Sequence, residues 1–263
     1  MGLFSMLQAK KQKKLDIKAE IMNEALSEVF TDCYYSLEEK IKAETVRDSG
    51  LIDEWNLDTD SYDMKKRFEY RGNDYFKGKY KGHEIECSDV DITKYFTVID
   101  TDEDGNQEER EDFETRFKGI WMICKLEKSL GAMVRVREKE DTPIIFRKIV
   151  GKRKQVKSDV ETENTSFNEQ FQVLTDNPQK AFYVLTPHFM EHILSADKKA
   201  EGRILLSFSN DKVHIAIHNG KDSFEIKKGS EIKEPELLKK RIQSELKYAT
   251  DILDELLKNQ NLF

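Results

Sequence analysis

Apolar residues recur at helical spacing near both ends of the chain. Between about residues 7 and 30 they lie three or four positions apart, which predicts an amphipathic helix with one face that must be covered. A second long helix is predicted after Pro235, because the fixed φ of proline suits a first helical turn. A shorter helix is predicted from Ser36 to Val46, where Ser36 and Glu39 have capping-box spacing. The apolar stripe of the last helix comprises Leu238, Ile242, Leu246, Ala249, Leu253 and Leu256.

The middle of the chain carries short apolar and β-branched runs separated by turn residues. Residues 120–124 are apolar throughout, which predicts a strand buried on both faces in the middle of a sheet. Tight turns at Asn210-Asp211 and Asn219-Gly220 favour antiparallel pairing of the strands around them. The other predicted strands are 75–80, 85–87, 133–137, 144–149, 171–174, 182–185, 204–208, 213–217 and 224–226.

These patterns predict an α+β fold, with a largely antiparallel β-sheet in two lobes and long amphipathic helices at the N- and C-termini. A basic and then acidic polar stretch separates the two groups of strands, as is typical of a flexible linker. The expected segments are an N-terminal helical segment at 1–48, a first β-rich lobe at 49–151, a linker at 152–166, a second β-rich lobe with one short helix at 167–230, and a C-terminal helix at 231–263.

Composition and charge exclude some classes of function. Phe and Tyr are too frequent for a disordered chain, so we expect a folded protein. The formal net charge of -7 leaves no overall positive charge to neutralise a phosphate backbone, so nucleic-acid binding is not expected. Cys33, Cys87 and Cys124 are far apart and are expected to be reduced. Because no transmembrane run or secretory signal is found, the expected location is cytoplasmic.

One acidic segment has the ligand spacing of a calcium-binding EF-hand loop. Ca²⁺ prefers clustered oxygen ligands, and Gly105 falls where such a loop turns sharply. The expected ligands are Asp100, Asp102, Asp104 and Glu111. The aromatic and β-branched residues before the loop instead favour a strand, and Asp104-Gly105 is a common hairpin turn. The segment is therefore either a calcium loop between two helices or the solvated tip of a hairpin, and both alternatives stay open.

A five-residue pattern, His-Phe-Met-Glu-His, matches the signature of inverted zinc proteases. On a helix, His188, Glu191 and His192 share a face, so two imidazoles and one carboxylate could meet a zinc-bound water. A third ligand would have to come from a later helix, where Glu245 and Glu255 are candidates. The alternative is a surface helix with its apolar residues turned inward and both histidines turned outward.

The first residues of the chain combine apolar and basic side chains. The apolar residues Leu3, Phe4, Met6 and Leu7 precede the basic residues Lys10, Lys11, Lys13 and Lys14. Such a segment suits weak contact with an anionic membrane surface through residues 1–18, or docking on a partner. The alternative is the frayed, basic start of a helix.

Three segments rich in aromatic residues follow one another in the second half of the chain. They are Phe117-Lys118-Gly119-Ile120, Phe167 to Val173 and Phe182 to Met190. In kind and order they resemble a bacterial family known as domain of unknown function 3137. The resemblance implies a shared fold and a bacterial source. It implies no reaction, because the shared positions are aromatic, glycine and proline residues.

The function that these patterns favour is that of a non-catalytic cytoplasmic interaction or scaffold protein without a cofactor. Its partner is expected to be a protein that the sequence does not identify, and a homo-oligomer is compatible with the pattern. Peripheral membrane contact is a further alternative. The two chemical alternatives are a zinc-dependent hydrolase that uses His188, Glu191 and His192, and a calcium-binding protein that uses the Asp100–Glu111 loop.

Overall fold

Eight strands form one sheet in the computed structural model, which describes residues 3–53, 55, 67–101, 107–139, 160–199, 202–226, 231 and 234–258. The strands are β1 (Thr31–Ser36), β2 (Arg67–Tyr80), β3 (His83–Thr101), β4 (Gln107–Lys125), β5 (Val134–Glu138), β6 (Phe171–Thr175), β7 (Arg203–Ser209) and β8 (Lys212–His218). Their order is β1-β2-β3-β4-β8-β7-β5-β6, and every neighbouring pair is antiparallel. The predicted α+β class and antiparallel pairing are confirmed.

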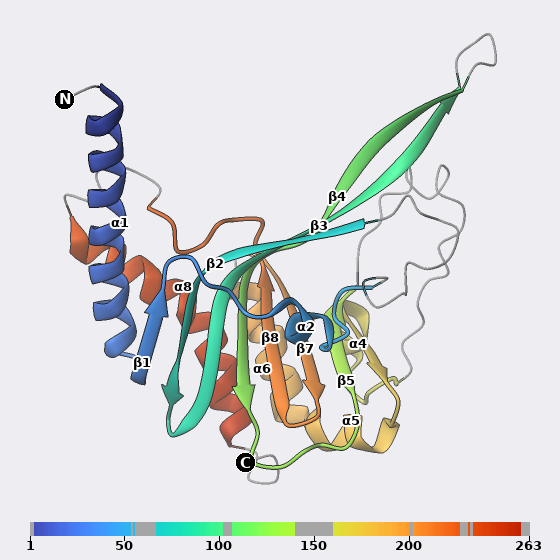
Figure 1. Ribbon diagram of the computed structural model, residues 1–263. Helices are drawn as coiled ribbons and strands as arrows, with labels where there is room; N and C mark the ends of the chain where they lie inside the picture. The colour runs from blue at the N-terminus through green and yellow to red at the C-terminus, as the bar shows by residue number, and fades with distance from the viewer. Residues whose placement is uncertain are drawn as a thin grey trace.

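Helices cover both faces of this sheet, but unequally (Figure 1). The helices are α1 (Leu3–Ser27), α2 (Ala43–Arg47), α4 (Thr165–Gln170), α5 (Pro178–Val184), α6 (Pro187–Lys199) and α8 (Pro235–Leu257). The long helices α1 and α8 confirm the predicted terminal helices, and α8 contacts both α1 and β8. Helices α6 and α8 lie behind the sheet in Figure 1, whereas the short α2 lies in front of it. In the described part of the chain, no helix is both long and apolar enough to cross a membrane.

The two predicted lobes share this sheet. Strand β5 precedes the expected linker in sequence, yet it pairs on one side with β6 and on the other with β7, which both follow the linker. Strand β4 in turn pairs with β8. The sheet is therefore continuous across the two lobes. Residues 152–159 of the expected linker lie outside the described residues.

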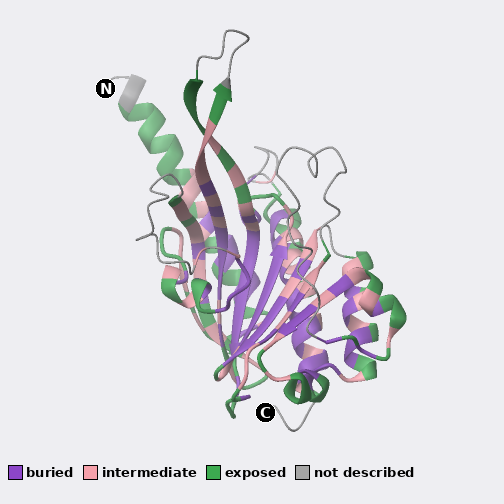
Figure 2. Cartoon of the chain, turned by 90° about the vertical axis from the view of Figure 1, so that its right-hand side faces the viewer, coloured by how far each residue is buried: buried purple, intermediate pink, exposed green. Residues whose placement is uncertain are grey.

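The apolar run at residues 120–124 serves two cores at once. Because side chains alternate along a strand, Ile120 and Met122 face the large core beneath the helices. Trp121 and Ile123 face a smaller core on the other side, which α2 and its flanking residues cover. Strand β4 has neighbours on both edges, which confirms the prediction of a strand buried in mid-sheet. Figure 2 shows the buried residues concentrated in these central strands and on the facing sides of the helices.

Two elements extend beyond this core. The ends of β3 and β4 pair with each other as far as Thr101 and Gln107, beyond the last pairing of β3 with β2 at Tyr95. We call residues 96–101 and 107–112 the β-arm. The first part of α1 extends in the same direction, at the other side of the sheet (Figure 1). In Figure 2 the first part of α1 and the outer part of the β-arm are exposed, whereas residues 96–98 and 112 of the β-arm are of intermediate burial.

Several predicted elements differ from the structure. Residues 182–185 were predicted as a strand but belong mainly to helix α5, which Asn177 caps by accepting a hydrogen bond from the backbone of Lys180 at 3.2 Å. Residues 224–226 form bends rather than a strand. Of the helix predicted at 36–46, only residues 43–46 are helical, because Ser36 ends β1 and α2 begins at Ala43. The predicted strand at 144–149 lies outside the described residues.

Gly119 is required by the close packing of β4 on β8. Its φ is +145°, and a Cβ atom there would lie 2.2 Å from the carbonyl oxygen of Ile217. No side chain fits at that distance unless one of the two strands moves. This contact gives a physical reason for glycine in the Phe117-Lys118-Gly119 segment.

Replacement of Gly119 by alanine is therefore expected to be much more costly than the same change at Gly82. Gly82 also has a positive φ, +92°, but a Cβ atom at that position would meet nothing within 4 Å. Both changes share a backbone penalty, so their difference isolates the clash. We expect Gly119→Ala to lower the free energy of unfolding by about 2 kcal/mol more than Gly82→Ala, measured by urea denaturation. Equal losses would contradict this explanation.

Candidate functional site

The most unusual group in the protein is a lysine in the core. Lys18 of α1 is only 2% exposed, and its ammonium group contacts two carboxylates. The distances from Nζ are 2.7 Å to Oδ2 of Asp74 and 2.5 Å to Oε1 of Glu225. Burial by itself would lower the pKa of Lys18, but the charge of Asp74 and the hydrogen bonds to both carboxylates outweigh it and raise the pKa. Lys18 is therefore charged inside the protein.

A β-bulge places Asp74 opposite this ammonium. The pairing of β2 with β3 is interrupted between Asn73 and Phe76, and Asp74 has a left-handed φ of 54°. Bulges redirect side chains, and aspartate is among the residues that tolerate this conformation. The Asp74 carboxylate also accepts hydrogen bonds from the hydroxyl of Tyr35 and the side-chain amide of Asn73. Burial raises the pKa of Asp74 more than Lys18 lowers it, so the ion pair does not fully offset the cost of burying this carboxylate.

A second acidic pair adjoins the first. Asp89 of β3 accepts a hydrogen bond from the backbone N–H of Ser223 at 2.5 Å, and its carboxyl group is hydrogen-bonded to that of Asp222. Burial and this second carboxyl raise the pKa of Asp89. Both effects favour retention of a proton on Asp89. Arg241 of α8 holds the same segment by donating to the carbonyl oxygens of Ser223 and Glu225, at 2.8 and 2.6 Å.

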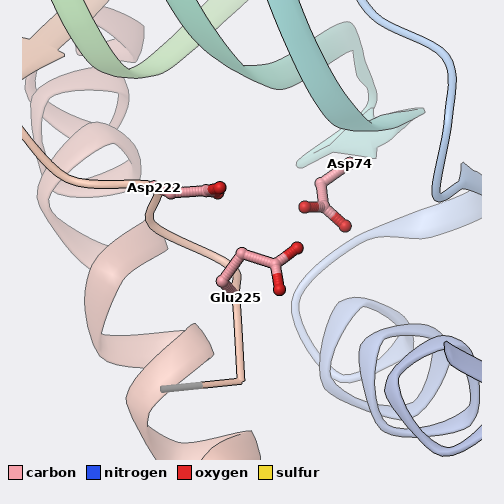
Figure 3. A group of neighbouring side chains, drawn as sticks. All are labelled: Asp74, Asp222 and Glu225. Carbon is pink, nitrogen blue, oxygen red and sulfur yellow. The ribbon is translucent and has the colours of Figure 1, made fainter. Parts of the chain in front are cut away.

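Three of these carboxylates have the spacing of cation ligands. Asp74, Asp222 and Glu225 each place an oxygen within 4.8 Å of the others, and Figure 3 shows their carboxylates directed toward one another. The ammonium of Lys18 already contacts two of the three and supplies positive charge there. We therefore interpret this group, with Lys18, Tyr35 and Asp89, as a junction between segments that is buried at Lys18, Asp74 and Asp89 and exposed at Asp222.

The sequence interpretation missed this junction. One signal was available, because Lys18 lies three residues after Leu15 and four before Met22 on the apolar stripe of the first helix. A lysine at that position faces the core and needs a partner. Its partners come from residues 56 and 207 positions away in sequence, which no local pattern reveals.

The predicted zinc residues lie on α6 beside the end of α8. Nε2 of His188 is 2.9 Å from Oε1 of Glu255, and Nδ1 of His192 is 3.9 Å from Oε2 of the same residue. Glu191 is exposed. The carboxylate that faces the imidazoles is thus that of Glu255, one of the two expected third ligands, whereas Glu245 pairs with Arg241. Hydrolysis through His188, Glu191 and His192 stays a prediction.

Two of the predicted calcium residues, Asp100 and Glu111, lie on the β-arm. Strands flank the loop on both sides, so the alternative of two flanking helices was wrong. Residues 83–101 and 107–125 pair along their whole length, with one register shift between Ile92 and Thr93. Asp100 forms an ion pair with Arg110 at 3.1 Å, and Glu111 forms one with Arg67 at 3.3 Å. Asp102 and Asp104 lie outside the described residues. Calcium binding by this loop stays a prediction.

The first half of α1 is an exposed surface. Residues 5–13, which we call the free half of α1, are all exposed, and helix burial begins only near Lys14. Met6 and Leu7 are 63% and 58% exposed, and they line a shallow pocket with Ala9, Lys10 and Lys13. The helix therefore presents apolar and basic groups together.

Lys18→Met is expected to destabilise the protein strongly. Removal of one member of a buried ion pair leaves the other charge uncompensated, at a cost of about 3–5 kcal/mol. Lys79→Met is a matched control, because the ion pair of Lys79 with Asp32 is exposed and should contribute less than about 1 kcal/mol. Chemical denaturation at pH 7 measures both. A loss for Lys18→Met as small as that for Lys79→Met would show that the junction is not a source of stability.

Asp89→Asn is expected to weaken the pH dependence of stability. The pKa of Asp89 is raised in the folded protein, so Asp89 contributes most to the free energy of unfolding at low pH. This contribution is lost as pH rises from about 4, where the unfolded chain releases the proton. Asparagine still hydrogen-bonds but cannot titrate. The free energy of unfolding of the variant, relative to that of the wild type, should therefore rise by about 1 kcal/mol per pH unit between pH 5 and 8. If the wild type and Asp89→Asn gave parallel curves of Tm against pH, this would contradict the retention of a proton on Asp89.

Comparison with known proteins gives a family but no activity. No curated protein matches the chain. The crystal structure of the mycobacterial trehalose monomycolate transport factor A, TtfA, is similar over 88% of this chain and 95% of that chain, with 11% sequence identity and a TM-score of 0.37. The family described as "Protein of unknown function (DUF3137)" matches residues 115–258, which include all three aromatic-rich segments. Because this match covers more than half of the sequence, the chain belongs to the DUF3137 family.

Proposed function

We propose that the protein is a non-catalytic cytoplasmic interaction protein that binds through the free half of α1 and the β-arm. The observation that carries the proposal is that both elements extend beyond the core in the same direction, at opposite sides of the sheet (Figure 1). Both also carry exposed apolar side chains, which on α1 are Met6 and Leu7. On the β-arm and at its base, Ile99 and Phe113 are 53% and 64% exposed. A helical stretch of this length gains little stability alone in water, so a covering partner would stabilise it.

The charges of the two elements are opposite. The free half of α1 carries Lys10, Lys11 and Lys13 and no acidic residue. The β-arm carries Glu108, Glu109, Glu111 and Asp112 around a single arginine on the same strand. Opposite charge on two exposed surfaces of one chain favours contact between copies of that chain.

A second copy is the partner that fits this arrangement. A symmetric pair in which the free half of α1 of each copy lies beside the β-arm of the other would bring these opposite charges together. Such an interface is self-complementary and closes after two copies. An anionic membrane surface is the alternative partner for the basic, apolar helix, and a zinc-dependent hydrolase or calcium-binding protein remains a chemical alternative.

Charge reversal tests this assembly. We expect Lys10→Glu/Lys11→Glu/Lys13→Glu and, separately, Glu108→Lys/Glu109→Lys to weaken self-association by about tenfold or more, because each places like charges at the contact. Light scattering at low and high salt would measure the oligomeric state. A mixture of the two variants should associate again, since their charges are complementary.

Two results would contradict the proposal. A wild-type protein that is monomeric at low salt would exclude the second copy as the partner. Sedimentation of the wild type with phosphatidylglycerol vesicles, lost in the lysine variant and absent with phosphatidylcholine vesicles, would assign the free half of α1 to a membrane surface instead.

A further inference from the structure

A cluster of side chains that are able to bind a metal ion lies where α6 begins beside the end of α8. His188 and His192 are one helical turn apart, so both imidazoles lie on the same side of α6. Glu255 of α8 faces them, with its two carboxylate oxygens 2.9 Å from His188 and 3.9 Å from His192. The two helices contact each other, which fixes the approach of the three side chains.

We propose that His188, His192 and Glu255 bind a divalent transition-metal ion such as Zn²⁺ or Ni²⁺. Imidazole nitrogens and a carboxylate oxygen are common ligands of such ions, and two histidines four residues apart on a helix can share one ion. Ligands bound tetrahedrally at about 2.0–2.1 Å lie about 3.3 Å from one another. The two distances from Glu255 lie on either side of that value.

The environment of the three side chains favours a cation. Glu255 is only 5% exposed, so its charge is partly removed from water, and Lys258 at 2.6 Å now supplies the compensation that a bound cation would take over. Nε2 of His192 is enclosed and has no hydrogen-bond partner. Buried polar atoms are normally paired, so the imidazole of His192 is incompletely satisfied by the protein alone. An ion beside Glu255 would compensate the charge of that carboxylate, and it would bind Nδ1 of His192, the ring nitrogen that faces Glu255, rather than the enclosed Nε2.

Binding requires a local movement of exposed side chains. Among the residues that the structure describes, three ligand atoms lie within 4.8 Å of one another only at Asp74, Asp222 and Glu225, so the two imidazoles must approach each other. His188 can rotate because it is 71% exposed. Lys258, which contacts Oε2 of Glu255 at 2.6 Å, is also exposed and can withdraw.

The metal would join two helices. Glu191, the residue that a hydrolase would use as its base, is exposed and makes no hydrogen bond or ion pair within the described part of the chain. The ion would hold the first turn of α6 to the last turn of α8, with water in its remaining position. The inference is independent of the assembly of two copies.

Titration of the full chain with ZnCl₂ and NiCl₂ tests this site. Calorimetry is expected to show one equivalent of bound ion, and Tm should rise because the ion binds only the folded protein. Co²⁺ should give visible absorption bands when bound by these ligands. We expect His188→Ala, His192→Ala and Glu255→Gln each to weaken the affinity by about tenfold or more.

Two controls distinguish this site from its rivals. Glu191→Gln on the same helix, and Asp222→Asn in the acidic group, should leave the affinity unchanged. The exposed position of His188 makes His188→Ala the decisive variant if a change at Glu255 prevents folding. The proposal is overturned if the wild type binds no ion, if His188→Ala binds as tightly as the wild type, or if Asp222→Asn alone abolishes binding.

Discussion

The arrangement of the helices on the sheet depends on how one buried ammonium group is neutralised. Lys18 cannot leave water without anionic partners, and these come from strand β2 and from the segment between β8 and α8. Asp74 reaches it only through the β-bulge, and Arg241 fixes the backbone around Glu225. Apolar burial holds the helices and the sheet together without specifying one position of α1 on the sheet. The charge contacts at Lys18 supply that specificity, since a shift of α1 would separate the ammonium from both carboxylates.

Sequence patterns predicted the elements that local periodicity determines. The terminal helices and the strand at 120–124 followed from apolar spacing alone. Predictions failed where an apolar run lacked a clear period. Residues 182–185 have strand-like composition, yet Asn177 and Pro178 begin a helix before them, and these start signals outweigh the composition. The order of the strands could not be predicted, because β5 inserts between two strands that come later in sequence.

In the candidate sites, too, sequence patterns predicted what local spacing determines and missed what depends on the tertiary fold. The His188 pattern identified two side chains that do share a helical face, because four-residue spacing determines this. Glu255 was one of two expected partners, and only the packing of α8 on α6 distinguishes it from Glu245. The junction at Lys18 was missed because its contacts depend on the tertiary fold. For the acidic loop, flanking strand propensity was the better guide to the local structure than ligand spacing.

The position of β5 has a consequence for biosynthesis. This strand leaves the ribosome before β6 and β7, the two strands that pair with it, and β4 likewise precedes its neighbour β8. The nascent chain must therefore carry the open edges of β4 and β5 until β6, β7 and β8 have been made, and such edges invite pairing with other chains. Neither half of the chain can complete the pairing of this sheet without strands from the other half.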